Sequence, residues 1–207
     1  ELPLEAEVEP EELETLCDIA TEFSRYAASE TIREGFLPVR GGFRVGLCGT
    51  AVMKDGVNTN LKNLSSAVVR IARERRGIAD CIAPRLYQNG GFASTLILSP
   101  PGGGKTTLLR DLVRRLSQGG PDCPPQRISL IDERGEVAVV FRGAPQMDVG
   151  PRTDVLDACP KALGIPIVLR AMNPQIIAVD EITVREDLTA MSLAAGCGVG
   201  LLATIHA

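Results

Sequence analysis

The stretch from Ser94 to Ser117, STLILSPPGGGKTTLLRDLVRRLS, restricts the possible folds of this chain more than any other. It opens with the short apolar run 94–98 and continues through a loop of proline and glycine at 99–104. From Lys105 onward, apolar residues recur at the three-four spacing of an amphipathic helix, at Leu108, Leu109, Leu112, Val113 and Leu116. The stretch therefore predicts a strand, a tight loop and a helix in direct succession.

The loop carries the groups that a polyphosphate requires. Glycines let backbone N–H groups approach an anion, the start of a helix adds a positive end, a lysine reaches the outer phosphates, and a hydroxyl binds magnesium. We predict a nucleotide-binding loop made of Ser99, Pro100, Pro101, Gly102, Gly103, Gly104, Lys105, Thr106 and Thr107. The alternative is a glycine-rich turn before an ordinary helix, and the strand and helix context favours the nucleotide loop.

One position of the loop departs from the usual pattern G-x-x-x-x-G-K-S/T. Ser99 stands where the pattern has its first glycine, which marks the sharp exit from the strand. We expect Ser99, Pro100 and Pro101 to make this bend in another way.

Three later apolar runs, 127–131, 175–179 and 199–205, are each followed directly by polar residues. The residues that follow these runs are Asp132-Glu133-Arg134, Asp180-Glu181 and His206, in that order. Segments with helical character are expected between the runs, at 154–163, 165–172 and 188–195. Strands that alternate with helices form parallel sheets, and chemistry gathers beyond the carboxyl ends of such strands. We expect these polar residues to converge on the nucleotide loop.

This convergence suggests roles for each group in phosphoryl transfer to water. Lys105 and the loop amides neutralise phosphate charge, Thr106 and Asp180 bind Mg²⁺, and Glu181 orients or deprotonates the attacking water. The alternative for Asp180 and Glu181 is a helix N-cap with a solvated neighbour.

The remaining strand-end residues are less specific. Asp132 and Glu133 could position water, or one of them could form a surface ion pair with Arg134, and the sequence leaves both open. His206 is the only histidine, and we expect it to sense the outer phosphate, although a lone histidine is often structural.

The chain before the loop predicts a smaller α+β domain. Helical spacing begins at Glu11 and extends to Ala27, and a second helical piece covers 30–34. Antiparallel strands follow over 36–70, with turns at 41–42 and 55–56 and a last strand over 66–73, and then a short helix at 77–87. We predict a domain at 1–88, a linker at 89–93 and an α/β domain with a parallel sheet at 94–207.

Composition limits the classes of partner. The net charge is −4, from 22 Lys and Arg against 26 Asp and Glu, so no overall basic field attracts nucleic acid. A local basic cluster comprises Arg70, Arg73, Arg75 and Arg76. Arg70 and Arg73 either reach a phosphate from the small domain or a neighbouring subunit, or form a solvated edge.

The six cysteines are scattered along the chain, which predicts reduced thiols. No run of residues is long and apolar enough to cross a bilayer. We therefore expect a cytoplasmic chain.

Taken together, the motifs identify a resemblance. The order SPPGGGKTT, IDERGE, IIAVDEI, LLATIHA resembles the Walker A, Asp-box, Walker B and His-box motifs of the secretion superfamily of hexameric ATPases. Longer stretches, REGFLPVRGGFRVGLCGTAV, LKNLSSAVVRIARE, RGAPQMDVGPRTDVLDACPKALGI and MNPQIIAVDEI, resemble the stage III sporulation protein AA family of spore-forming bacteria. The Walker B pair is Asp-Glu, where secretion ATPases often have Gly-Glu.

The resemblance implies a RecA-like ATPase core, continuing beyond Ala207, that binds ATP and Mg²⁺ between two domains of a homo-hexamer. It implies that Arg70 and Arg73 supply arginines to the nucleotide. It also implies a motor on the mother-cell side, peripherally associated with a membrane complex, that energises a channel between mother cell and forespore. The expected partners are membrane-embedded sporulation channel proteins, with no specific nucleic acid.

Two other functions stay open from the sequence. A nucleic-acid-associated P-loop ATPase is favoured by the basic cluster and opposed by the acidic charge and the few aromatics. A nucleotide-binding scaffold without turnover is favoured by Ser99 and opposed by the complete set of Lys105, Thr106, Asp180 and Glu181.

Overall fold

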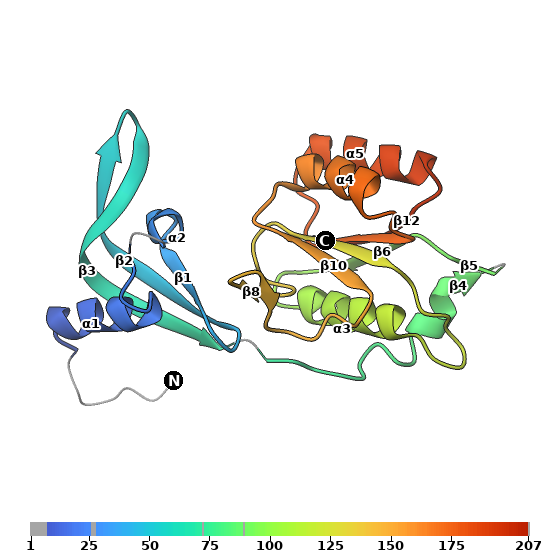
Figure 1. Cartoon of the computed structure of the whole chain (residues 1–207), viewed down its shortest axis with the longest axis horizontal. Coiled ribbons are helices and arrows are strands. Elements are labelled where there is room, and N and C mark those ends of the chain that lie inside the picture. Colours follow the sequence, from blue (N-terminus) through green and yellow to red (C-terminus); the bar gives the residue numbers. More distant parts are fainter. Residues whose placement is uncertain (1–7, 26–27, 72, 89, 207) are drawn as a thin grey trace. The chain divides into compact units, whose positions relative to one another are not determined.

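The computed structural model describes residues 8–25, 28–71, 73–88 and 90–206, and the chain divides into two compact units (Figure 1). The first unit is Glu1–Arg73 and the second is Glu74–Ala207. The division thus falls before Glu74, whereas the sequence placed it at the linker 89–93. Among the residues described, no helix is long and apolar enough to span a membrane.

The first unit combines two helices with an antiparallel sheet. The helices are α1 (Pro10–Ala20) and α2 (Ser29–Arg33), and the strands β1 (Phe36–Val39), β2 (Phe43–Lys54) and β3 (Val57–Ile71) form a sheet in the order β1-β2-β3. Both predicted turns are confirmed, since Gly41, Gly42 and Gly56 adopt positive φ angles. The core of this unit joins α1 to the sheet through buried residues, among them Leu13, Cys17, Leu37, Val45, Leu47 and Leu64.

Helix α1 ends earlier than expected. The predicted helix extends to Ala27, but Glu22 and Phe23 have φ angles of 51° and 59°, which a right-handed helix does not allow. The hydroxyl of Thr21 donates to the carbonyl of Cys17 at 2.9 Å, at the end of the helix. Residues 26–27 lie outside the described residues.

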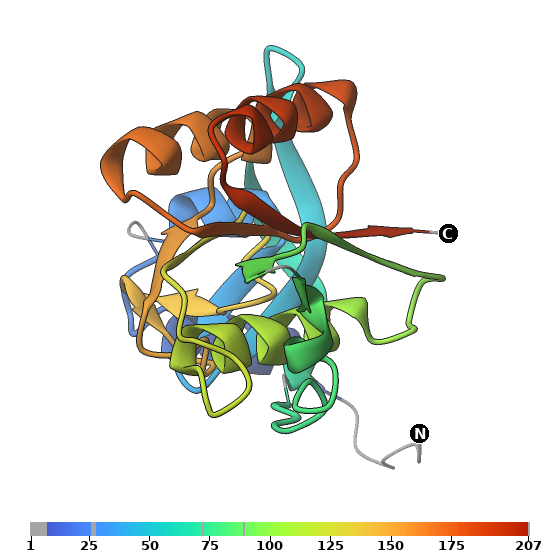
Figure 2. The same ribbon diagram turned by 90° about the vertical axis from the view of Figure 1, so that its right-hand side faces the viewer.

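The second unit contains a five-stranded parallel sheet, which confirms the α/β prediction. Its strands are β6 (Thr95–Ser99), β7 (Ile128–Asp132), β10 (Thr153–Asp157), β11 (Ile176–Val179) and β12 (Gly200–His206), in the order β10-β7-β11-β12-β6. The helices are α3 (Lys105–Gln118), α4 (Lys161–Ala171) and α5 (Arg185–Gly196). Figures 1 and 2 show α3 on one face of the sheet and α4 with α5 on the other.

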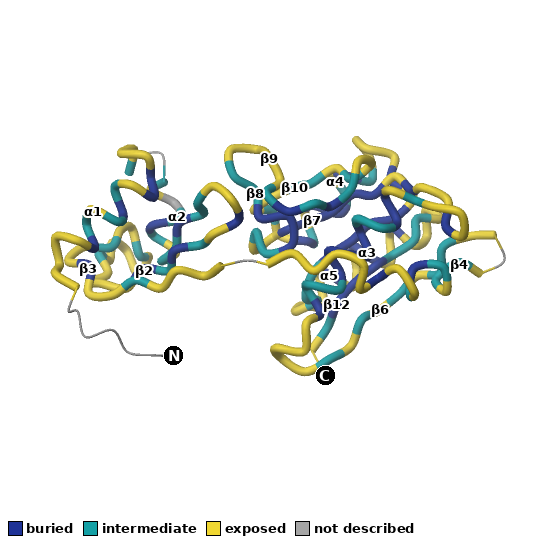
Figure 3. The backbone as a smooth tube through the Cα atoms, turned by 90° about the horizontal axis from the view of Figure 1, so that it is seen from below, coloured by how far each residue is buried: buried dark blue, intermediate teal, exposed yellow. Residues whose placement is uncertain are grey.

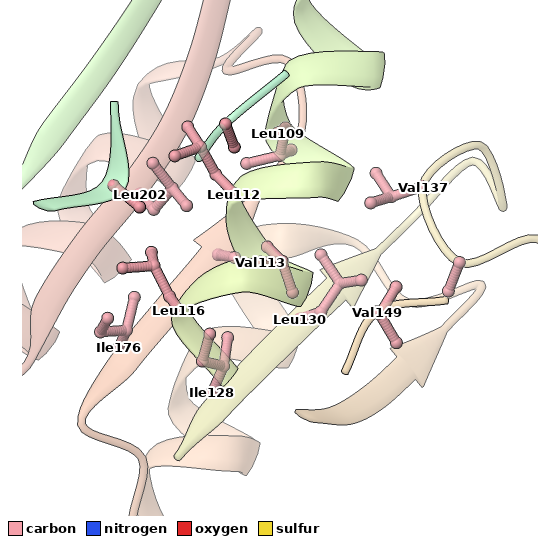
Figure 4. Close-up of a cluster of buried hydrophobic side chains, with 14 of the residues drawn as sticks. Leu109, Leu112, Val113, Leu116, Ile128, Leu130, Val137, Val149, Ile176 and Leu202 are labelled. Atoms are coloured by element: carbon pink, nitrogen blue, oxygen red, sulfur yellow. The ribbon is translucent and has the colours of Figure 1, made fainter. Parts of the chain in front are cut away.

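The core of the second unit lies on both faces of the central strands. Every residue of β7 and β11 is buried, and Figure 3 shows the buried backbone running through this unit. The apolar face of α3 packs on the sheet (Figure 4), with Leu109, Leu112, Val113 and Leu116 against Ile128, Leu130, Ile176 and Leu202. Side chains of α4 and α5 cover the opposite face, where they meet Ile131, Ile177 and Val179. These two layers fix the carboxyl ends of the strands.

Residues 74–93 pack on this core, which explains the position of the division. In place of the predicted helix 77–87, turns lead to a 3₁₀ helix, η1 (Ala83–Leu86), and a small hairpin joins β4 (Tyr87–Gln88) to β5 (Gly91–Phe92). Ala79 and Ala83 are fully buried in the core around α3. The predicted linker is therefore largely a hairpin, although Asn89 lies outside the described residues.

The predicted helix 154–163 is wrong in its first half. Residues 153–157 form the edge strand β10, whose register pairs Asp154 with Ser129 of β7, and the helix α4 starts only at Lys161. Tertiary pairing with β7 outweighs the short helical pattern. A second small hairpin, β8 (Val140–Phe141) with β9 (Ala144–Pro145), precedes β10.

Candidate active site

The loop between β6 and α3 wraps around the side chain of Lys105. Gly104 precedes the helix with φ 83°, and Gly102 has φ 75°, conformations that favour glycine. The ammonium of Lys105 donates to the carbonyls of Ser99 at 2.8 Å and Pro100 at 3.1 Å. Its third contact is Nδ1 of His206, at 2.8 Å. The loop and the end of β12 therefore meet at one lysine.

Ser99 makes the bend together with Gly103. The Ser99 hydroxyl donates to the carbonyl of Pro100 at 3.2 Å, and the amide of Gly103 donates to the same carbonyl at 3.1 Å. A Cβ atom at position 103 would lie 1.9 Å from Oγ of Ser99. The serine thus occupies the space that a side chain at 103 would need. Pro101 is exposed, and Thr107 is half-buried in the first helical turn.

Thr106 and Asp180 lie together, as predicted. The Thr106 hydroxyl donates to Oδ2 of Asp180 at 2.8 Å, and the hydroxyl of Thr204 donates to Oδ1 at 2.5 Å. Hydroxyl and carboxylate oxygens are hard donors that suit Mg²⁺, which takes one or two protein ligands and completes its shell with water and phosphate oxygens. Elsewhere in the described residues as well as here, no group of three or more His, Cys, Asp or Glu side chains could hold a metal.

Glu181 lies at the centre of a chain of charged contacts. Its Oε1 lies 3.1 Å from Nε2 of His206, and its Oε2 accepts from Arg134 at 2.7 Å. Because Nδ1 of His206 accepts from the Lys105 ammonium, the proton of a neutral ring is on Nε2 and points to Glu181. Lys105, His206, Glu181 and Arg134 are therefore linked in series.

Asp132 makes structural contacts. The residue is 1% exposed, and its carboxylate accepts from the amides of Glu136, Val137 and Ala138, at 2.9, 3.1 and 2.8 Å. Arg110 of α3 reaches the same loop and donates to the carbonyls of Val137 at 2.6 Å and Glu136. Burial lowers the pKa of Arg110, and nearby Asp132 opposes this shift. These contacts favour a structural task for Asp132.

Glu133 is engaged with the start of α4. Its carboxylate forms an ion pair with Lys161, whose side chain is 4% exposed. Arg134, which was expected as a surface partner of Asp132 or Glu133, forms an ion pair with Glu181. A water-positioning role for Glu133 stays a prediction.

Arg70 and Arg73 lie in the first unit, whereas all the contacts above lie in the second. Arg70 is exposed in β3 opposite Arg44, and Arg73 is exposed at the end of that unit. Their role at the nucleotide stays a prediction.

Two features of the site were not expected from the sequence: Thr204, and the contact between Arg134 and Glu181. Thr204 is fully buried and precedes His206 by two positions in β12. Alternate residues of a strand share a face, so this spacing was the available signal. The partner of Arg134 had no comparable signal, because it depends on the loop after β7.

The chain matches a protein-family model described as sporulation stage III, protein AA, over residues 5–207. It is 44% identical over 184 residues to the stage III sporulation protein AA of Bacillus subtilis (strain 168), covering 89% of this chain and 60% of that protein. The protein SEEDLING PLASTID DEVELOPMENT 1 of Arabidopsis thaliana is 31% identical over 140 residues, covering 66% of this chain and 19% of that protein. The chain thus spans less than two thirds of these relatives' length.

Two solved structures show the same fold. The Yersinia pseudotuberculosis ATPase DotB is similar with a TM-score of 0.57 and 16% identity, over 97% of this chain and 54% of that one. The pilus retraction motor PilT, solved with bound ADP, is similar with a TM-score of 0.51 and 20% identity, over 80% of this chain and 44% of that one. The parallel-sheet unit therefore has the RecA-like fold of secretion ATPases. Since the family model covers nearly the whole sequence, the chain belongs to the sporulation stage III protein AA family.

Proposed function

We propose that this chain hydrolyses ATP with Mg²⁺ at the carboxyl end of its parallel sheet. The observation that carries the proposal is the convergence of the ends of β11 and β12 with the loop that follows β6. Lys105 lies within hydrogen-bond distance of His206, and Thr106 lies within hydrogen-bond distance of Asp180. Glu181 in turn contacts His206. Phosphate charge, a metal and a nucleophilic water are the three elements of this reaction, and each has a matching residue.

Each residue of the site has its own role in the proposed hydrolysis. The loop amides and Lys105 bind phosphate oxygens, and Thr106 and Asp180 would hold magnesium, which supplies charge neutralisation when bound. Glu181 orients the water and accepts its proton, because its carboxylate is held between Arg134 and His206. His206 contacts both Lys105 and Glu181, so displacement of Lys105 toward a phosphate changes the contact that reaches Glu181.

On the larger scale, the proposed role is that of a secretion-type motor. It assembles as a homo-hexamer, docks on membrane-embedded channel proteins and energises a channel between mother cell and forespore during sporulation. Membership of the sporulation family and likeness in fold to DotB and PilT support this role. In the hexamer, Arg70 and Arg73 supply positive charge to the nucleotide, from the same chain or a neighbour.

The contacts of the basic cluster do not favour nucleic acid as the main partner. Arg76 forms ion pairs with Glu74 at 2.9 Å and Asp148 at 3.5 Å, so its charge is already compensated within the second unit. Phosphate binding by such a residue first requires loss of these pairs.

The test is Mg²⁺-dependent ATP hydrolysis as a function of protein concentration. We expect turnover per chain to rise with concentration, and Lys105→Ala and Glu181→Gln each to lower it by about 100-fold or more. Lys62→Ala and Glu186→Gln, at exposed positions, are the matched controls. ATP binding without turnover above that of the two site variants, at every concentration, would contradict hydrolysis and favour a nucleotide-binding scaffold.

A further inference from the structure

The buried hydroxyl of Thr204 is used twice at the candidate site. Thr204 lies in β12 and is fully buried. Its Oγ1 donates to Oδ1 of Asp180 at 2.5 Å and accepts from the backbone amide of Glu181 at 2.7 Å. A hydroxyl has one proton to donate and lone pairs to accept, so both capacities have partners here. One side chain thus holds the two acidic residues that follow β11.

The backbone of Thr204 also binds the segment that follows β11. Its carbonyl accepts from the amide of Ile182 at 2.9 Å. Asp180, Glu181 and Ile182 are therefore each bonded to the same residue on the neighbouring strand.

Glu181 needs such support because its backbone is in an unfavourable conformation. Its φ angle is 45°, in the left-handed region that residues with a Cβ rarely adopt. Conformations of this kind persist only where the surroundings hold them in place. The bond from the Glu181 amide to Thr204 is the side-chain contact that fixes the peptide at this turn.

The orientation of Asp180 depends on the same hydroxyl. One carboxylate oxygen accepts from Thr204 and the other from Thr106, so the plane of the carboxylate is set from both sides. Thr106 belongs to the nucleotide loop and would itself bind the metal with Asp180, whereas Thr204 is fully buried in β12. Thr204 therefore holds the Asp180 carboxylate in its orientation.

We propose that Thr204 is a positioning residue that sets Asp180 for Mg²⁺ and Glu181 for the attacking water. The proposal rests on the proposed function of the site. Because the hydroxyl acts on both acids, its loss lowers both the affinity for the magnesium–nucleotide complex and the rate of hydrolysis.

The test compares Thr204→Val, which keeps the branched shape and removes the hydroxyl, with Thr204→Ser, which keeps the hydroxyl. Two quantities are measured in the intact chain: kcat with its Mg²⁺ dependence, and the affinity for fluorescent ADP with Mg²⁺ or with EDTA. We expect Thr204→Val to lower kcat and to weaken binding with Mg²⁺ by about 10- to 100-fold, and to leave binding in EDTA unchanged. Thr204→Ser retains values within about 3-fold of the parent.

The matched control is Thr95→Val, at the opposite end of the adjacent strand β6, where the hydroxyl donates to the carbonyl of Ala93. The proposal is overturned if Thr204→Val binds and hydrolyses like Thr95→Val, or if Thr204→Ser is as impaired as Thr204→Val, since packing alone would then matter. A parent that binds Mg²⁺–ADP but does not turn over refutes hydrolysis, and the binding comparison still decides on Thr204. A parent that binds no nucleotide refutes both.

Discussion

At the scale of single residues, Ser99 and Gly103 form one unit of the nucleotide loop. A Cβ atom at 103 would lie 1.9 Å from Oγ of Ser99 and 3.1 Å from the carbonyl of Pro100. That carbonyl also accepts from Lys105, so the loop cannot yield without moving the lysine. Gly103→Ala should therefore weaken nucleotide binding by about 10-fold or more, which corresponds to about 1.4 kcal/mol.

The double variant tests this steric explanation. Adding Ser99→Gly removes the closest atom and should restore part of the affinity of Gly103→Ala, as measured by titration with a fluorescent nucleotide. Equal losses in the presence and absence of the serine side chain would show that Gly103 is required for another reason.

Asp132 gives a second prediction at this scale. Its buried carboxylate accepts from three backbone amides, and an asparagine would turn an NH₂ group toward at least one of these donors. Asp132→Asn should lower the free energy of unfolding by about 2 kcal/mol, the range of hydrogen bonds to a charged group. Denaturant titration measures this, with Asp154→Asn at an exposed position as the control. If Asp132→Asn lost hydrolysis but kept its stability, Asp132 would have a catalytic role and not a structural one.

The sequence predicted that several residues of the candidate site lie together, but not the contacts that Thr204 and Arg134 make with them. The pairing of Thr106 with Asp180, and the approach of His206 to Lys105, follow from strand ends that share one edge of a parallel sheet. The bond from Thr204 to Glu181 depends on a left-handed turn after β11, and spacing alone carries no sign of that turn.

At the scale of elements, the ion pair of Glu133 and Lys161 joins the end of β7 to the start of α4. The two partners differ in exposure, with 4% for the Lys161 side chain and 36% for Glu133. Glu133→Gln leaves a buried ammonium without its counter-charge, whereas Lys161→Met leaves a carboxylate that water can reach. We expect Glu133→Gln to cost about 2 kcal/mol of unfolding free energy and Lys161→Met to cost less. Denaturant titrations of both variants that give the reverse order would contradict this asymmetry.

The elements that the sequence identified correctly are those with a strong local pattern. Helix α3 has a continuous apolar face, and strands β7 and β11 are apolar runs. The sequence therefore predicted that the sheet is buried on both faces. The edge strand β10 was predicted as a helix, because the short segment 153–157 obtains its conformation from the register with β7. Residues 77–87 were also predicted as a helix, whereas Ala79 and Ala83 are buried within turns and a 3₁₀ helix.

At the scale of the whole molecule, Glu74 anchors the beginning of the second unit. Its carboxylate accepts from the amide of Asp148 at 2.5 Å and pairs with Arg76. Burial raises the pKa of Glu74, but the Asp148 amide and Arg76 outweigh it, so the pKa is lowered. A lowered carboxyl pKa contributes stability that is complete above the unfolded value of about 4.3 and is lost as the pH falls through the folded value.

Glu74→Gln should therefore lower the thermal midpoint above about pH 5, and the difference from the parent should shrink as the pH falls below about 4. Thermal unfolding across this range measures the effect, with Glu186→Gln as the exposed control. A difference that stays constant with pH would show that the Glu74 charge does not contribute.

The division of the chain before Glu74 gives a prediction about independent folding. Ile82, Leu86 and Tyr87 pack against the core around α3, and the amide of Ala79 donates to the buried carboxylate of Asp111 at 2.8 Å. A fragment 74–207 retains these contacts. A fragment 94–207 loses these partly buried side chains, each contributing up to about 3 kcal/mol, together with the fully buried Ala79 and Ala83, and it leaves the Asp111 carboxylate without that donor. We expect the longer fragment to unfold cooperatively and the shorter one to lose about 5 kcal/mol or more, which is comparable to the whole stability of a domain. Circular dichroism during thermal unfolding compares the two, and equal midpoints would mean that residues 74–93 do not belong to this core.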